Sequence, residues 1–177
     1  RVRSSAASDV YKRQLYCHPR VSETMDDIIA FVQLALDKNV AYKAGDDVLF
    51  SVESVKDYGS LSKIKIDDLI AGTRIAVTDN KKYPMDFVLW KKTDDDGIKF
   101  HADFGDGRPG WHTECLVMIN KIFGQPLIDI HGGGFDLKFP HHENERAQSE
   151  AVYNSPLANN WMHVGFINMG DEKMSKS

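Results

Sequence analysis

The sequence predicts an α/β fold with a parallel sheet, which carries a small α+β insertion. Apolar runs at residues 87–90, 127–130 and 161–169 alternate with helical patterns, and this is the order of strands and helices in a parallel sheet. A glycine cluster at residues 132–134 directly follows one of these runs. Open α/β sheets bind ligands at that position, so the cluster favours the same fold class.

The chain divides into three parts by composition. Residues 1–18 begin with a polar, basic stretch, which we expect to be a tail or a cloning remnant; an organelle-targeting leader is the alternative. Residues 19–85 are predicted to form the α+β insertion, with little hydrophobic core of its own. Residues 86–177 are predicted to form the main α/β unit.

Local patterns predict the elements of the insertion. Residues 24–27 (TMDD) have the spacing of a capping box, which precedes an amphipathic helix. That helix ends near Asn39, a residue that suits the left-handed position after a helix. We expect a hairpin over residues 41–52 and a short helix over residues 66–71.

Composition excludes several classes of protein. Of the 177 residues, 42% are hydrophobic and 27% are charged, a balance that excludes disordered, collagen-like and coiled-coil chains. The net charge of −4 supplies no global positive field, so nucleic-acid binding would need a local basic patch. Two cysteines cannot build a disulfide scaffold and fit a reducing compartment. No apolar run approaches the roughly 20 residues of a membrane span, and we therefore expect a cytoplasmic protein without a membrane partner.

Two helices are expected in the main unit. One begins after Gly110 and ends at Gly124. The other has Pro140 in its first turn, where proline is favoured, and runs to about Tyr153. The apolar stripe of the first helix consists of Trp111, Cys115, Met118 and Ile122.

Three side chains of these helices suit a zinc ion. His141 and Glu145 are four residues apart and therefore share one helix face. Cys115 lies on a helix predicted to pack on the same sheet, so a thiolate, an imidazole and a carboxylate could meet, although zinc usually has four ligands. The alternatives are a surface hydrogen bond between His141 and Glu145, and a Cys115 that is only a small buried apolar residue.

Two further segments suit a nucleotide. The glycines at residues 132–134 permit close approach of the backbone to a phosphate or sugar, and Asp136 has a carboxylate for ribose hydroxyls. Residues 173–177 (KMSKS) place two lysines among small residues, a pattern suited to closing over a polyphosphate. The alternatives are an ordinary glycine loop and a solvated basic tail.

Longer motifs resemble one known family. Residues 173–177 are similar to the second signature of class I aminoacyl-tRNA synthetases. Within that class, the chain resembles the cysteinyl-tRNA synthetase (cysteine–tRNA ligase) family from about Pro19 to Ser177. This resemblance implies the second half of a Rossmann-like catalytic domain with a connective insertion. The motifs that carry it are DFVLWK (86–91), GRPGWHTEC (107–115), HGGGFDLKFPHHENE (131–145), AQSEA (147–151) and WMHVG (161–165).

The resemblance also implies a reaction and its partners. These are ATP-dependent activation of cysteine and transfer of cysteine to tRNA(Cys), with Mg²⁺ accompanying ATP and with a monomeric parent enzyme. One Zn²⁺ per subunit would recognise the substrate thiolate and separate cysteine from serine. Its ligands in this chain would be Cys115, His141 and Glu145.

Further roles follow from the same resemblance. Trp111 would close on the bound amino acid, and the lysines of the KMSKS segment, Lys173 and Lys176, would stabilise the reacting phosphate. The implied ATP-binding residues are Gly132, Gly133, Gly134, Asp136, Val164 and Lys176.

Two motifs of the family are absent from these 177 residues. They are the first class I signature, His-Ile-Gly-His, and the zinc-binding cysteine that precedes it; Cys17 lacks the flanking motif of that cysteine. A domain that reads the anticodon would follow residue 177. We therefore expect this segment to be inactive by itself and to hold zinc weakly. The alternatives are the cysteine ligase of mycothiol synthesis and a non-catalytic zinc-binding or tRNA-associated fragment.

Overall fold

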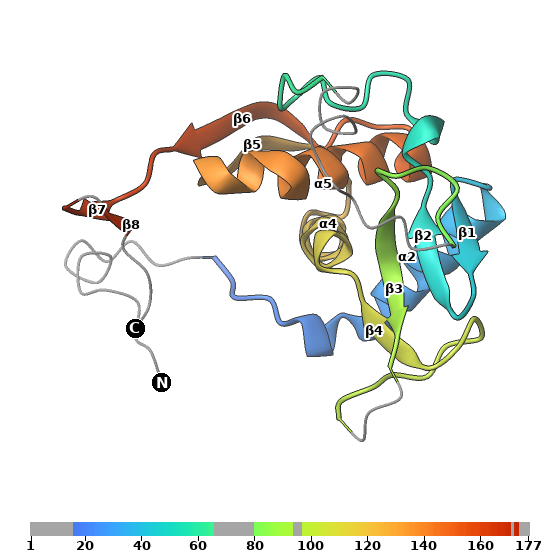
Figure 1. The fold of residues 1–177 in the computed structure, drawn as a ribbon. Helices are drawn as coiled ribbons and strands as arrows, with labels where there is room; N and C mark the ends of the chain where they lie inside the picture. Colours follow the sequence, from blue (N-terminus) through green and yellow to red (C-terminus); the bar gives the residue numbers. More distant parts are fainter. Residues whose placement is uncertain (1–15, 66–79, 94–96, 171, 174–177) are drawn as a thin grey trace.

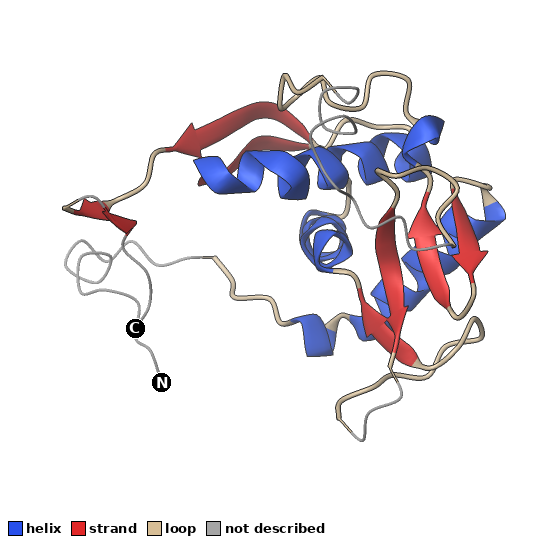
Figure 2. Cartoon of the chain, in the orientation of Figure 1, coloured by secondary structure: helices blue, strands red, loops and turns tan. Residues whose placement is uncertain are grey.

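In the computed structural model, a four-stranded sheet and a two-stranded parallel sheet flank a group of helices (Figures 1 and 2). The structure describes residues 16–65, 80–93, 97–170 and 172–173. Helix α4 (Trp111–Phe123) lies in the middle of the molecule and links the two sheets. Among the described residues, no helix is both long enough and apolar enough to cross a membrane.

The first helical region agrees with the predicted helix but not with its predicted cap. A short 3₁₀ turn, η1 (Val21–Glu23), leads into α2 (Met25–Asp37). The Thr24 hydroxyl donates to the carbonyl of Arg20 and makes no capping bond to α2, so the predicted capping box is wrong. The turn η1 already supplies a partner for this hydroxyl. Asn39 has φ 57° and takes the predicted left-handed position.

The four-stranded sheet is antiparallel throughout and follows chain order. Strands β1 (Ala41–Ala44) and β2 (Asp47–Phe50) form the predicted hairpin. Strand β3 (Phe87–Lys92) pairs with β2 on one side and with β4 (Gly107–Pro109) on the other. A 3₁₀ turn, η2 (Val52–Ser54), follows β2.

The prediction that the strand at residues 87–90 belongs to the parallel sheet is wrong. Strand β3 is one of the two inner strands of the antiparallel sheet, and Leu89 and Trp90 are fully buried there. A continuous apolar run indicates burial on both faces, and that burial occurs in either kind of sheet. The predicted helix at residues 66–71 lies outside the described residues.

The predicted parallel sheet is formed by two strands and the helix between them. Strand β5 (Ile128–Gly134) pairs in parallel with β6 (Ala158–Val164), and the chain crosses from one to the other through a helix. This is a βαβ unit, so the predicted α/β class is confirmed. The predicted last strand at residues 161–169 begins earlier and is interrupted, because β7 (Asn168–Met169) turns back to pair with β8 (Glu172–Lys173).

The crossover helix is continuous from Pro140 to Tyr153, with π-helical winding at both ends and α-helical winding in the middle. A 3₁₀ turn, η3 (Phe135–Leu137), precedes η4 (Lys138–His142), in which Phe139 is extended, so the helix begins at Pro140 as predicted. It continues through α5 (Glu143–Gln148) and η5 (Ser149–Tyr153). Asn154, with φ 54°, ends it.

Helix α4 buries a different face from the predicted one. Gly124 ends the helix with φ 66°, as expected, but the buried residues are Thr113, Leu116 and Val117. The predicted stripe begins with Trp111, which is 56% exposed, and Cys115 is only half-buried. Apolar periodicity alone does not distinguish a core face from a face that lines a site.

One hydrophobic core runs through both predicted units. Phe50 of the insertion stacks on Phe87 of the main unit, with ring centroids 4.9 Å apart. Buried Asp86 accepts hydrogen bonds from the Tyr42 hydroxyl and the Val52 amide. The sheet and the core therefore cross residue 85, and the division into units at that residue stays a prediction.

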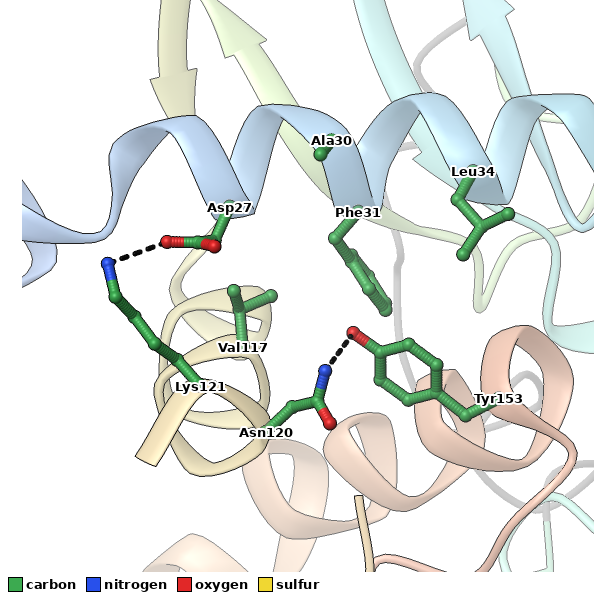
Figure 3. Close-up of a pocket in the computed structure, with 8 residues that line it drawn as sticks. All are labelled: Asp27, Ala30, Phe31, Leu34, Val117, Asn120, Lys121 and Tyr153. Carbon is green, nitrogen blue, oxygen red and sulfur yellow. Dashed lines mark hydrogen bonds and ion pairs between the residues drawn. The ribbon is translucent and has the colours of Figure 1, made fainter. Parts of the chain in front are cut away.

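A shallow pocket of about 220 Å³ lies where α2, α4 and η5 meet (Figure 3). There the Phe31 and Tyr153 rings are 5.5 Å apart, Asn120 donates to the Tyr153 hydroxyl, and Lys121 pairs with Asp27 at 2.7 Å. None of the site residues predicted from the sequence lines this pocket. These contacts therefore hold helices together at a distance from the predicted chemistry.

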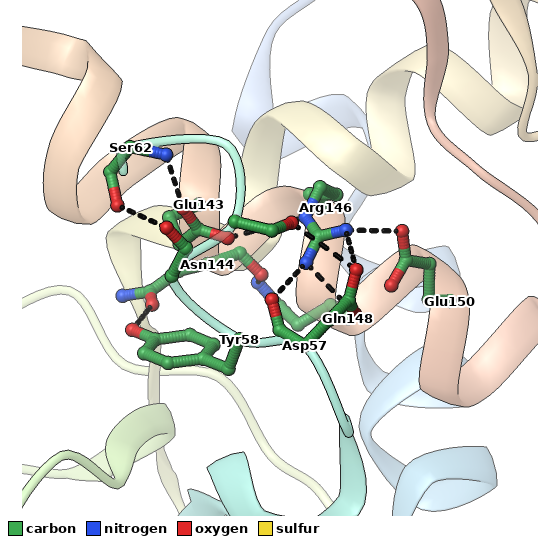
Figure 4. A network of polar contacts seen from close by, with 10 residues as sticks. Asp57, Tyr58, Ser62, Glu143, Asn144, Arg146, Gln148 and Glu150 are labelled. Carbon is green, nitrogen blue, oxygen red and sulfur yellow. Dashed lines mark hydrogen bonds and ion pairs between the residues drawn. The ribbon is translucent and has the colours of Figure 1, made fainter. Parts of the chain in front are cut away.

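A buried polar network fastens the segment after β2 to helix α5 (Figure 4). Arg146 donates to the Asp57 side chain and carbonyl, to Glu143 at 3.2 Å and to Glu150 at 2.8 Å. On the same helix, Asn144 accepts from the Tyr58 hydroxyl. These bonds fix both the position and the rotation of the helix.

Replacing Arg146 is expected to destabilise the fold strongly. Arg146→Ala leaves the fully buried Glu143 carboxylate without its cationic partner, and breaking such a pair costs about 3–5 kcal/mol. Urea unfolding measures the loss in free energy of unfolding. The matched control is Arg20→Ala, which breaks an exposed pair with Glu23 at the same i,i+3 spacing and is expected to cost below about 1 kcal/mol. Equal losses in the two variants would contradict this account.

Candidate metal centre and active site

The helices bring the three predicted zinc ligands to one place. Cys115 lies on α4, His141 on η4 and Glu145 on α5, and α4 packs against both other elements. One ligand atom from each residue, the Cys115 Sγ among them, lies within 4.8 Å of the others. His141 and Glu145 are buried and Cys115 is half-buried. Such a group of sulfur, nitrogen and oxygen donors is typical of zinc sites.

The two carboxylate oxygens of Glu145 differ in their contacts. Oε2 lies 2.6 Å from Nε2 of His131 on β5. Oε1 lies 3.0 Å from Nε2 of His141, but it is buried and accepts no hydrogen bond among the described residues. Burial favours the neutral acid, but contacts with His131 and His141 outweigh it and lower the pKa of Glu145 to about 2. A buried anionic oxygen without a donor is a group that a cation would satisfy.

The thiol beside this carboxylate resists ionisation. Burial raises the pKa of Cys115 to about 12, and the negative charges of Glu145 and Glu114 add to the effect. A zinc ion would reverse the balance, because a coordinating thiol is deprotonated. The residues therefore fit Zn²⁺ in two ways. Their donor atoms are ones that zinc binds, and the negative charge of Glu145 is one that a cation would balance.

Neutral imidazoles surround the ligand group. Nδ1 of His112 lies 3.0 Å from Nδ1 of His141, and Nδ1 of His142 lies 2.8 Å from Nε2 of His163. Burial lowers the pKa of His112 and of His142 to about 4. Both rings are therefore neutral at neutral pH. A neutral imidazole has one nitrogen without a proton, and that nitrogen can accept a hydrogen bond or bind a metal.

No role was predicted for His112, His131 or His163. His112 lies three residues before Cys115 on α4, whereas His131 and His163 lie on β5 and β6 and meet the ligands only through the packing of the sheet and the helices. Strand alternation was the available signal: His131 pairs in register with Trp161, and His163 lies two residues further on the same face of β6.

Trp111 lies beside the ligand group, at the start of α4. Its ring stacks on His141, with centroids 4.3 Å apart and an interplanar angle of 24°. The side chain is nevertheless 56% exposed. Trp111 therefore borders the site and keeps one side available for a bound molecule.

The predicted nucleotide-binding residues gather at the carboxyl ends of β5 and β6. Gly134 and Val164 are partners in the parallel register, and exposed Asp136 follows in η3. The glycines were expected in a loop, but they form the end of β5, because β6 pairs with them through Val164. A methyl group on Gly133 would come within 2.8 Å of the His142 ring, so this glycine also permits close packing.

The lysine segment is described only in part. Lys173 lies in β8, beyond the end of β6 (Figure 1), and Lys176 lies outside the described residues.

Cys115 is expected to be poorly reactive in the metal-free chain. At pH 8 its raised pKa leaves very little thiolate, and the thiolate is the form that reacts with iodoacetamide. We expect iodoacetamide to alkylate Cys115 at least about tenfold more slowly than exposed Cys17. Peptide mass spectrometry measures the two rates. Glu114→Gln removes one nearby negative charge and is expected to speed the reaction at Cys115 alone. Equal rates at the two cysteines would contradict the assigned burial.

Comparison with known proteins shows the family to which the chain belongs. Residues 4–177 match the profile of the family described as "tRNA synthetases class I (C) catalytic domain". The chain is 53% identical over 160 residues to the cysteine–tRNA ligase of Halalkalibacterium halodurans and 56% identical over 160 residues to that of Shouchella clausii; each alignment covers 90% of this chain and 34% of the relative. For the cysteine–tRNA ligase of Staphylococcus aureus, the identity is 52% over 165 residues, covering 93% of this chain and 35% of the relative.

The chain thus spans about a third of the length of the curated relatives it matches. The family match, in contrast, covers nearly the whole chain, and the βαβ unit agrees with it. The α/β fold described above is accordingly part of a Rossmann-like catalytic domain, and the chain belongs to the class I (C) tRNA synthetase catalytic-domain family.

Proposed function

We propose that this chain is the part of a cysteine–tRNA ligase that recognises cysteine through zinc and holds part of the ATP site. The observation that carries the proposal is the meeting of Cys115, His141 and Glu145, where the buried Glu145 Oε1 accepts no hydrogen bond from the part of the chain that the structure describes. The identity to proteins named cysteine–tRNA ligase supports the choice of amino acid and of tRNA(Cys).

The proposed metal is one Zn²⁺, held by Cys115, His141 and Glu145. When bound, zinc supplies an affinity for the sulfur of cysteine that a hydroxyl does not match, which separates cysteine from serine. Trp111 borders this position and would cover the bound amino acid with the exposed side of its ring. The neutral rings of His112 and His142 add no positive charge that would compete with the metal.

The proposed nucleotide site lies at the carboxyl ends of β5 and β6. Gly132, Gly133 and Gly134 would allow close approach of the backbone, Asp136 would accept hydrogen bonds from the ribose, and Val164 would lie near the base. Register supports this grouping, because Gly134 is the partner of Val164. ATP would be accompanied by Mg²⁺.

The lysines of the KMSKS segment would complete the reaction site. Lys173 and Lys176 would stabilise charge on the α-phosphate while the carboxylate of cysteine attacks it and pyrophosphate leaves. The cysteinyl group would then pass to the 3′ end of tRNA(Cys). We expect the 177-residue segment to form no adenylate by itself, because its sequence contains no His-Ile-Gly-His motif. A monomeric parent and a cytoplasmic location remain predictions from the sequence.

His141→Ala is expected to remove zinc and cysteine activation together. In a full-length ligase that carries this segment, the variant lacks a buried ligand, so zinc retention after gel filtration and cysteine-dependent ATP–pyrophosphate exchange are both expected to fall at least about 100-fold. Metal analysis and the exchange assay measure the two effects.

His101→Ala serves as the matched control, because His101 is exposed and pairs with Asp106 at 2.7 Å, outside the ligand group. This control is expected to retain zinc and exchange activity. A His141→Ala enzyme that keeps its zinc, or that keeps its exchange activity, would refute the proposed ligand set.

A further inference from the structure

We propose that His131 is a positioning residue that fixes the orientation of the Glu145 carboxylate for metal binding. Its Nε2–H donates to Oε2 of Glu145 at 2.6 Å. With Oε2 engaged, the other oxygen, Oε1, lies 3.0 Å from Nε2 of His141 and accepts no hydrogen bond from the described residues. The carboxylate would then bind zinc through one oxygen. This inference rests on the proposed zinc site.

The hydrogen bond from His131 restricts a side-chain rotation that is otherwise free in a glutamate ligand. Rotation about the terminal bond of its side chain is broad, so an isolated carboxylate presents either oxygen or both. A donor held on one oxygen removes that freedom before the metal arrives and sets which oxygen faces it. Partners of this kind, outside the ligand set itself, typically contribute 10–100-fold to metal affinity.

His131 is itself held rigidly from three directions. It lies within β5, where its register partner is Trp161 of β6. The Trp161 ring meets it edge-on, with centroids 5.0 Å apart, and the centroid of the tilted His142 ring lies 4.6 Å away. The His131 side chain is only 15% exposed. A strand and two rings therefore determine where its Nε2 points.

A second metal ion is the competing interpretation of the same residues. His131, His142 and Glu145 also offer three ligand atoms within 4.8 Å of one another. However, the 2.6 Å separation of His131 Nε2 and Glu145 Oε2 is a hydrogen-bond distance, and it leaves no space for an ion between the two atoms. The observations therefore favour one ion and a hydrogen bond.

The test compares three variants of the 177-residue chain by zinc competition against a chromophoric chelator. His131→Leu removes the donor and keeps bulk, and its zinc affinity is expected to fall about 10–100-fold. His131→Gln can place an amide N–H near the position of Nε2 and is expected to recover most of the affinity. His163→Gln changes another histidine of the cluster, one that contacts His142 instead of Glu145, and its affinity is expected to stay unchanged. Thermal unfolding without metal shows that the variants are folded.

Equal zinc affinity in His131→Leu and the unsubstituted chain would overturn the inference. Binding of two zinc ions by the unsubstituted chain in native mass spectrometry, with one lost in His131→Leu, would overturn it in favour of a second metal site. Loss of affinity in both His131 variants, despite intact folding, would also contradict it, because the amide should restore the hydrogen bond.

A metal-independent measurement separates this inference from the proposed function. ¹⁵N NMR of the zinc-free chain reports which ring nitrogen of His131 carries the proton, and the inference requires Nε2–H. An Nδ1–H tautomer would refute the role of His131 even if zinc binds. If a full-length ligase that carries this segment binds no zinc, the proposed metal site fails, and a positioning role toward that metal fails with it; the tautomer result then shows whether the hydrogen bond itself exists.

Discussion

The site depends on one helix that is buried although most of its side chains are polar or charged. Every residue of α5, Glu143–Gln148, is buried, and the only apolar one is Ala147. Burying such groups without partners is costly, so the surrounding elements must supply them. The segment after β2 engages Glu143, Asn144 and Arg146 on one side of the helix, and α4 engages Gln148 through Thr113.

Glu145 is the residue of this helix whose side chain is only partly hydrogen-bonded. Oε2 accepts a hydrogen bond from His131, whereas Oε1 accepts none from the described residues. The nearby Cys115 thiol has a pKa raised to about 12. Because the other polar side chains of α5 are hydrogen-bonded to neighbouring elements, rotating the helix to give Oε1 a donor would break those bonds. The same network that stabilises the fold therefore holds a buried negative charge near Cys115 and His141, and a divalent cation would offset that charge.

The sequence predicted the parts of this arrangement that depend on local pattern. The helix after Thr24, the hairpin around Gly45 and the i,i+4 placement of His141 and Glu145 follow from short-range spacing, and the structure has them. What could not be predicted depends on partners distant in the chain. An apolar run does not reveal that β3 is antiparallel, and a glycine cluster does not reveal that β6 extends along it. His131 and His163 likewise become neighbours only through the register of β5 and β6. The roles of the ligand, nucleotide and lysine residues remain proposals.

The central claim is that zinc on Cys115, His141 and Glu145 recognises the sulfur of cysteine. Zinc-edge X-ray absorption on a full-length ligase carrying this segment tests it most directly, because sulfur ligands at about 2.3 Å are distinct from nitrogen and oxygen ligands at about 2.0–2.2 Å. The account predicts that the number of sulfur ligands rises by one when cysteine is added and does not change when serine is added. A sulfur count that cysteine leaves unchanged would contradict it.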